Sequence, residues 1–332
     1  MRRRNTSPDL VCPLGGLDPD TRAFVDDLAA TNAPPLSTLT PEQARAVQSA
    51  LQGGDVAVRP AQIEDRTIPG GSTGSIGIRI LRPVGGTALL PAVMCFHGGG
   101  WVMGDRETHD RFMREIAHGT GAAVIFVDYA RSPEARYPVA VEQAYAATRW
   151  IAEHGLALGL DGARIAVLGD SAGGNMAAVV ALLAKERGGP QIRLQVLLFP
   201  VTGAGFDTPS YSRFATDYYL TLDDMRWFWN QYLPDASLRA QPAAAPLHAT
   251  IDQLRGVAPA LIVTCECDVL RDEGEAYAHR LMVAGVPVMA TRYLGAIHGF
   301  VVLNALSHTP AARAAMAQTC AALAEAFAPS RV

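Results

Sequence analysis

The stretch IAVLGDSAGGN, residues Ile165–Asn175, decides the fold expected for this chain of 332 residues. It begins with a short apolar run, passes through a G-x-S-x-G pattern around Ser171, and opens an apolar, helix-forming segment that extends to about Arg187. A strand, a tight turn and a helix in this order place the serine at a sharp bend with its hydroxyl exposed. The N-terminus of the following helix directs positive charge at any anion formed beside Ser171.

The alternation of strand and helix patterns continues on both sides of this stretch. Apolar, β-branched runs predict strands at 76–81, 92–96, 123–127, 165–168, 196–199, 260–264 and 287–293, and helical patterns occupy 110–119, 139–154, 172–187, 273–284 and 310–327. Several strand runs are continuously apolar, as strands buried on both faces are. The sequence therefore predicts the α/β class with a mainly parallel central sheet.

Two segments depart from this alternation of strands and helices. Residues 1–55 carry helix signals without a strand pattern, and residues 201–256 delay the next strand. Between positions 206 and 232 the second segment holds nine of the chain's twenty-three aromatic residues. An extra helix packed on the body and a lid over an apolar pocket both fit this pattern. We expect a core of residues 56–200 and 257–332, with a cap formed by 1–55 and 201–256.

A glycine run directly after the strand at 92–96 points to the same chemistry as Ser171. His97 is followed by Gly98, Gly99 and Gly100, whose backbone N–H groups no side chain shields. We expect these amides, with that of Ala172, to stabilise a developing oxyanion. A phosphate cradle is the alternative, but no lysine follows the run and the spacing of a P-loop is absent. His97 is interpreted as a structural residue of this loop.

A base and an acid for Ser171 are expected later in the chain. Of the four histidines after the serine, His298 lies in a short loop after the last predicted strand, while His248, His279 and His308 lie in the insert, within a helix and at a helix start. Asp268 ends the strand run that begins at 260, and Asp272 is the second choice. The order Ser171, Asp268, His298 matches a serine, acid, histidine triad in which His298 takes the serine proton and Asp268 orients the imidazole.

Composition excludes several other classes of protein. Hydrophobic residues make up 49% of the chain and charged residues 18%, which is unlike a disordered chain, and the net charge of -4 gives no basic surface for nucleic acid. No apolar leader or membrane-spanning run is seen. None of the five cysteines has zinc or redox spacing, so we expect no metal site, buried thiols and a reducing, cytoplasmic compartment.

Together these residues resemble the hormone-sensitive-lipase-like branch of the α/β-hydrolase esterases, bacterial family IV. The likeness extends over about residues 60–325 and is carried by the stretches 97–101, 128–134, 169–175, 268–273 and 298–300, with further similarity at 219–221 and 227–228. The resemblance implies an eight-stranded, mostly parallel sheet flanked by helices, with a helical cap. It also implies a cofactor-independent serine carboxylesterase for short- to medium-chain acyl esters, which often forms a dimer.

The chain departs from the family pattern at two places. Val269 stands where proline is frequent, and Ala130-Arg131-Ser132 replaces Arg-Leu-Ala before Pro133-Glu134, which affects how Arg131 and Glu134 brace the glycine loop. The candidate substrate-binding residues are Trp101, Asp170, Phe206, Phe214, Tyr219 and Val269. Two other functions remain open: a small-molecule receptor of the same fold, against which His298 argues, and an amidase or transacylase using the same triad.

Overall fold

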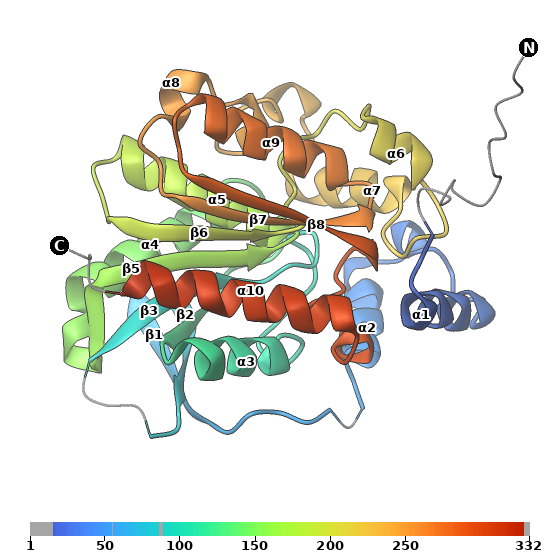
Figure 1. The fold of residues 1–332 in the computed structure, drawn as a ribbon. Helices are drawn as coiled ribbons and strands as arrows, with labels where there is room; N and C mark the ends of the chain where they lie inside the picture. Colours follow the sequence, from blue (N-terminus) through green and yellow to red (C-terminus); the bar gives the residue numbers. More distant parts are fainter. Residues whose placement is uncertain (1–15, 55, 86–88, 329–332) are drawn as a thin grey trace, which may run out of the picture.

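A mixed eight-stranded sheet forms the centre of the molecule (Figure 1). The computed structural model describes residues 16–54, 56–85 and 89–328. The strand order is β1-β2-β4-β3-β5-β6-β7-β8, with β1 and β2 antiparallel to their neighbours and all pairs from β4 to β8 parallel. The strands are β1 (Ala61–Pro69), β2 (Ser75–Pro83), β3 (Leu90–Phe96), β4 (Ala123–Asp128), β5 (Leu160–Asp170), β6 (Ile192–Leu198), β7 (Ala260–Cys267) and β8 (Val288–Ile297). The predicted α/β class and mostly parallel sheet are confirmed.

Helices cover both faces of the sheet. On one face α3 (Asp110–Thr120) and α10 (Pro310–Phe327) lie side by side, and on the other α4 (Val139–His154) packs on α5 (Ala172–Glu186) (Figure 1). The helix α9 (Arg271–Val283) lies with α5 on this second face, joined to it through α8 (Ile251–Leu254). Because both faces are covered, every residue of β7 is buried, which explains the apolar run Ala260–Val263 at its start.

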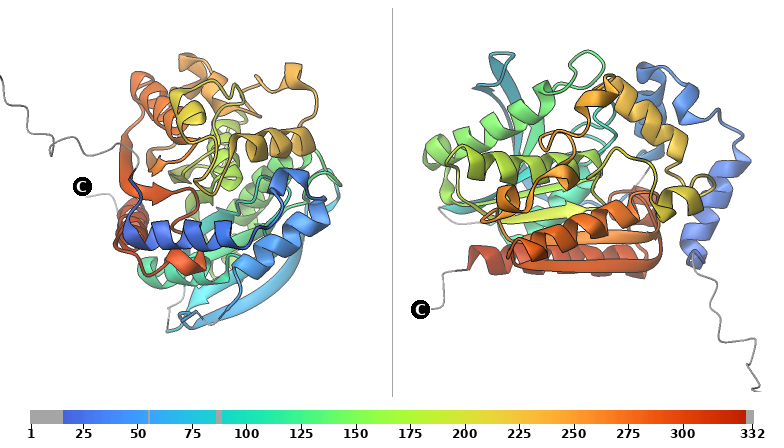
Figure 2. Two further views of the ribbon diagram at one scale, coloured as in Figure 1. Left: turned by 90° about the vertical axis from the view of Figure 1, so that its right-hand side faces the viewer. Right: turned by 90° about the horizontal axis from the view of Figure 1, so that it is seen from above.

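A further group of helices lies beyond the carboxyl ends of the parallel strands (Figure 1). From the N-terminal segment come α1 (Pro19–Ala30), the 3₁₀ turn η2 (Leu36–Thr38) and α2 (Pro41–Leu51), and from the insert come α6 (Pro209–Arg213) and α7 (Leu222–Tyr232). Figure 2 shows the two groups side by side, and η2 packs on α7. The later part of the insert differs, since η5 (Pro246–His248) and α8 pack on α5 and α9 of the body.

The turn between β5 and α5 holds Ser171 in a backbone conformation that L-residues rarely adopt. Its φ is 55° and its ψ is −119°, and its N–H donates to the carbonyl of Leu198 at 2.9 Å. A Cβ at Gly173 would lie 1.9 Å from the carbonyl oxygen of Phe96, and a Cβ at Gly169 would lie 2.1 Å from that of Gly173. Glycine at both positions therefore allows α5 to approach β3 and β5 closely enough to close the turn.

Gly173→Ala should destabilise the fold, because the added methyl group forces α5 away from β3. We expect the free energy of unfolding to fall by more than about 3 kcal/mol, measured by urea denaturation. Gly256→Ala is the control: its φ is +74° but its Cβ would meet nothing within 4 Å, so only the backbone strain of about 1 kcal/mol applies. Equal losses in the two variants would contradict the close-packing argument.

Candidate active site

The carboxyl ends of three parallel strands bring Ser171, Asp268 and His298 together. Ser171 follows β5, Asp268 follows β7 and His298 follows β8. Nε2 of His298 lies 2.9 Å from Oγ of Ser171, and Nδ1 of His298 lies 2.8 Å from Oδ2 of Asp268. The other carboxylate oxygen of Asp268 accepts the N–H of Leu270 at 3.0 Å. This arrangement can move a proton from the serine to the imidazole while the aspartate fixes the tautomer.

Burial keeps this chain of hydrogen bonds away from bulk water. Asp268 is 1% exposed, whereas His298 and Ser171 retain 6% and 7%. The ring of Phe199 meets the imidazole of His298 edge-on, with the ring centroids 4.9 Å apart. The second-choice acid, Asp272, lies elsewhere: its Oδ2 accepts the N–H of Ser210 at 2.8 Å and fixes the start of α6.

The glycine loop lies directly beside the serine, and one of its amides is already engaged. The N–H of Gly98 donates to Oδ1 of Asp170 at 3.0 Å. This contact corrects the expectation that Gly98 supplies an oxyanion donor, because a donor held by a carboxylate is not free for a substrate. Gly99 and Gly100 both line the cavity in front of Ser171. They remain, with Ala172, the candidate donors.

His97 has the structural surroundings expected of it. It is fully buried, its Nδ1 lies 2.8 Å from the carbonyl of Gly98, and its ring stacks on Tyr129 at 4.0 Å. The hydroxyl of Tyr129 donates to the carbonyl of His97 at 2.8 Å. Burial lowers the pKa of His97 well below its ordinary value, so the ring is neutral and serves to pack the loop.

A cavity of about 560 Å³ opens in front of the triad. Its apolar wall comes mainly from the N-terminal segment, the insert and the loop after β8: Leu28, Leu36, Val47, Leu51, Tyr219, Leu220, Phe228, Val302 and Leu303. Phe228 packs against the glycine loop, since a Cβ at Gly100 would lie 2.0 Å from its ring. The site is thus a largely apolar chamber with the serine, histidine and glycine amides on one side.

Only some of the predicted substrate-binding residues reach this cavity. Asp170 and Tyr219 line it. Trp101 is fully buried and stacks on Tyr232, with centroids 4.1 Å apart, which is why it does not reach the cavity. Phe214 and Val269 are also fully buried, and Phe206 packs edge-on against the buried Tyr211. None of these four residues lines the cavity, which differs from their expected role.

Several cavity residues had no signal in the sequence. The N-terminal segment was expected to belong to a cap, but nothing singled out Leu36, Val47 or Leu51. His109 was also missed: it lies in the cavity wall with its Nε2 3.3 Å from Oδ1 of Asp170. An isolated histidine at a helix start carries no pattern that distinguishes it from a surface residue.

Glu273, at the start of α9, is a buried carboxyl close to the triad acid. Its Oε1 accepts the N–H groups of Thr202 at 2.6 Å and Gly203 at 3.0 Å. Burial outweighs these contacts and raises the pKa of Glu273 to about 8. The carboxyl of Glu273 therefore keeps its proton to a higher pH than an ordinary glutamic acid.

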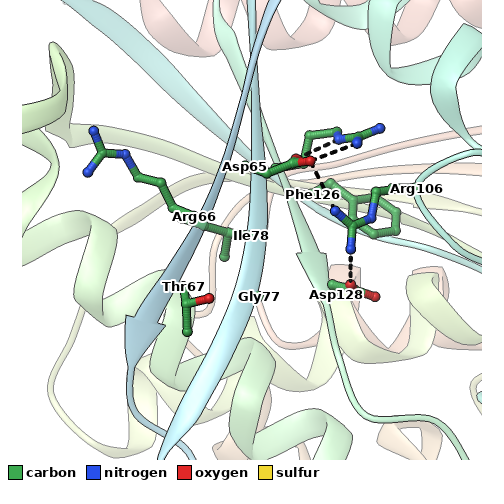
Figure 3. A pocket seen from close by; sticks show the side chains of 9 residues that line it. Asp65, Arg66, Thr67, Gly77, Ile78, Arg106, Phe126 and Asp128 are labelled. Atoms are coloured by element: carbon green, nitrogen blue, oxygen red, sulfur yellow. Dashed lines mark hydrogen bonds and ion pairs between the residues drawn. The ribbon is translucent and has the colours of Figure 1, made fainter.

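A second hollow, of about 220 Å³, lies over the strands β1, β2 and β4 (Figure 3). Most of its charged groups are paired: Arg106 contacts Asp65 at 3.1 Å and Asp128 at 2.9 Å (Figure 3). Arg79 pairs with Asp65 at 2.7 Å. It contains no member of the triad. Within the described ranges, no group of three or more histidine, cysteine or acidic residues is placed to hold a metal ion.

Comparison with known proteins identifies the class to which this site belongs. The sequence profile of the family described as "alpha/beta hydrolase fold" matches residues 93–302. The carboxylic ester hydrolase LipN of Mycobacterium tuberculosis is 41% identical over 300 residues, 88% of this chain and 75% of the relative. An ethyl acetate hydrolase of Pseudomonas putida is 35% identical, covering 87% and 93%.

Solved structures give the same result. A thermostable esterase from Pseudomonas putida superposes with a TM-score of 0.93 at 48% identity, covering 95% of this chain and 99% of that one. A fungal esterase from Rhizomucor miehei has a TM-score of 0.89 at 39% identity, covering 95% and 98%. The chain belongs to the α/β-hydrolase family, in its hormone-sensitive-lipase-like branch. Its fold, triad and relatives make it a carboxylic ester hydrolase.

The ionisation of Glu273 should make the free energy of unfolding fall as the pH rises. Its folded-state pKa of about 8 lies above the ordinary 4.5. The resulting stabilisation is complete below the ordinary pKa and is lost as the pH rises through about 8. Glu273→Gln keeps an oxygen acceptor for the amides of Thr202 and Gly203 but cannot ionise. We expect its Tm to fall less than that of the native protein between about pH 5 and about pH 9.

A matched exposed site provides the control for this measurement. Glu186, at the exposed end of α5, should give a Glu186→Gln variant whose Tm follows the native pH profile. Identical profiles for Glu273→Gln and the native protein would refute the assignment of the pH dependence to Glu273.

Proposed function

We propose that the protein hydrolyses short- to medium-chain acyl esters through an acyl-serine intermediate on Ser171. The observation that carries this proposal is the continuous hydrogen-bonded path from Ser171 through His298 to Asp268 beside an apolar cavity. A serine hydroxyl is a weak nucleophile at neutral pH, and a positioned imidazole removes this limitation.

The geometry supports a two-step reaction. His298 accepts the hydroxyl proton through Nε2 as Ser171 attacks the ester carbonyl, and the imidazolium is stabilised by Asp268. The amides of Gly99, Gly100 and Ala172 stabilise the tetrahedral oxyanion, each worth about 3 kcal/mol in the transition state. His298 then protonates the departing alcohol, and water repeats the sequence to release the acid.

The size of the cavity suits a single small-molecule ester. A volume of about 560 Å³ lies within the range of about 300–1,000 Å³ that holds one drug-sized ligand. We propose that the N-terminal segment and the insert 201–256 form the cap that limits this volume over a core of 56–200 and 257–332. Of the segment 1–55, residues 1–15 and 55 lie outside the described residues. In the insert, the part up to α7 supplies the wall, since the later residues pack on the body.

The remaining expectations concern assembly and compartment. The family resemblance favours a homodimer, which analytical ultracentrifugation tests directly.

A reducing, cytoplasmic compartment is supported by Cys95, Cys265, Cys267 and Cys320, which are buried and free of disulfides. Cys12 lies outside the described residues. No helix in the described part of the chain has the length and apolar character needed to cross a bilayer.

Ser171→Ala tests the nucleophile. The variant should lower kcat on p-nitrophenyl butyrate by roughly 10⁶-fold if the triad acts as a unit. A fluorophosphonate probe should label the native protein and not the variant. Ser237→Ala removes an exposed serine and is the matched control, with native activity expected. Near-native turnover by Ser171→Ala would contradict the assignment of Ser171 as the nucleophile.

An acyl-chain series tests the size of the site. p-Nitrophenyl butyrate should be cleaved at least roughly tenfold faster, as kcat/KM, than the palmitate ester, because a cavity of about 560 Å³ has to hold both the acyl chain and the nitrophenyl group. Equal rates on emulsified long-chain triglyceride and soluble butyrate would show instead that the cavity extends to accept a long acyl chain.

A further inference from the structure

The loop that carries the oxyanion donors has an unusual backbone. Gly99, Gly100 and Trp101 have φ values of 100°, 62° and 61°, three left-handed residues in succession. Such a conformation is costly for a bulky side chain such as that of Trp101 and persists only where its surroundings fix it. The direction of the Gly99 and Gly100 amides therefore depends on what holds the residues that follow them.

A neighbouring loop holds this turn through backbone contacts. The carbonyl of Gly99 accepts the N–H of Met103 at 2.8 Å, which folds residues 99–103 on themselves. The carbonyl of Trp101 accepts the N–H of Ser132 at 2.8 Å, and the guanidinium of Arg131 donates to the carbonyl of Gly104 at 2.8 Å. Residues 101–104 are thus tied to residues 131–132.

One side chain from the N-terminal segment joins the two loops. Nε of Arg45, on α2, donates to the carbonyl of Val102 at 2.8 Å, and Nη2 donates to the carbonyl of Ser132 at 3.0 Å. The same guanidinium forms a two-point contact with the carboxylate of Glu134 at 2.8 Å and 2.7 Å. The side chain of Arg45 is 20% exposed and that of Glu134 is 57% exposed. The two contacts with backbone carbonyls are therefore partly shielded from water, whereas the ion pair faces solvent. A planar guanidinium suits this set of acceptors in a way that an ammonium cannot.

We propose that Arg45 is a positioning residue for ester hydrolysis, which holds the oxyanion loop in its active geometry from the N-terminal helix α2. The inference rests on the proposed function, because it assigns the Gly99 and Gly100 amides to the transition state. It places part of the catalytic geometry under the control of a segment that contains no member of the triad.

The contacts of α2 separate this role from simple anchoring of the cap. The side chain of Gln52, just after α2, donates to the carbonyl of Thr108 at 2.8 Å and accepts the N–H of Asn304 at 2.9 Å. These contacts keep that end of α2, with its cavity residue Leu51, on the body when Arg45 is replaced. Replacing Arg45 should therefore mainly remove the contacts that hold the carbonyls of Val102 and Ser132.

The ion pair is insensitive to pH in the range of an esterase assay. Hydrogen bonding to Arg45 lowers the pKa of Glu134 to about 2, and the same contact raises the pKa of Arg45. Both groups stay charged from weakly acidic to alkaline solution, so the effect of replacing Arg45 should be equal across that range.

Arg45→Met, Arg45→Lys and Glu134→Gln test the proposal on p-nitrophenyl butyrate. Arg45→Met should lower kcat by about 10- to 100-fold with KM changed less than about threefold, because oxyanion contacts form only in the transition state. Binding of a boronic acid transition-state analogue should weaken by a similar factor. Arg45→Lys should recover part of kcat, and Glu134→Gln should lose less than Arg45→Met because the carbonyl contacts remain. Rates are expressed per site labelled by fluorophosphonate, which corrects for unfolded protein.

The alternatives give different patterns. A rise in KM with kcat unchanged would show that Arg45 only anchors the cavity wall, and a lower Tm with native kcat per labelled site would show a purely structural role; either result overturns the proposal. Arg149→Met, which breaks an exposed pair with Glu153 within α4, is the matched control and should be native. Failure of the native protein to hydrolyse esters or to be labelled at Ser171 would overturn the proposed function instead.

Discussion

The left-handed backbone at Ser171 is the constraint on which the rest of the site depends. The strain of such a residue is about 1–3 kcal/mol and is sustained by its neighbours. The N–H of Ser171 is held by the carbonyl of Leu198, and its own carbonyl accepts the amides of Asn175 and Val201 at 3.0 Å and 3.1 Å. The end of β6 and the first turn of α5 thus fix the serine between them, with the hydroxyl directed at His298.

The chemistry of the site could be predicted from sequence because its signals are local. Ser171, Asp268 and His298 each follow a recognisable strand, and parallel strands end at one edge of a sheet. The strand before His298 is longer than predicted, since β8 continues to Ile297, beyond a register shift in its pairing with β7. The strand β1 was not predicted at all. Its sequence AQIEDRTIP buries only Ile68, so an exposed edge strand left no hydrophobic pattern to detect.

The cavity walls were harder to predict because composition does not say which way a side chain faces. The insert is rich in aromatic residues, yet Phe214 packs inward while Phe228 covers the glycine loop. Residues such as Leu36 come from the other end of the chain. They meet the insert where the N–H of Ser37 donates to Oδ1 of Asp224 at 3.2 Å. Apart from Val302 and Leu303, which follow His298 closely, the apolar wall and the triad lie on separate stretches of sequence. Most of the pocket's shape can therefore change without a change in the catalytic residues.

The contact of the residue after α2 with Asn304, far along the chain, also has a consequence for biosynthesis. Gln52 and Asn304 are separated by 252 residues, so their contact cannot form until the ribosome has added all the residues between them. At a translation rate of about 5–20 residues per second, Asn304 is synthesised roughly 13–50 s after Gln52. During translation the core sheet can assemble strand by strand. The helix α2, which supplies part of the cavity wall, reaches its final position only later.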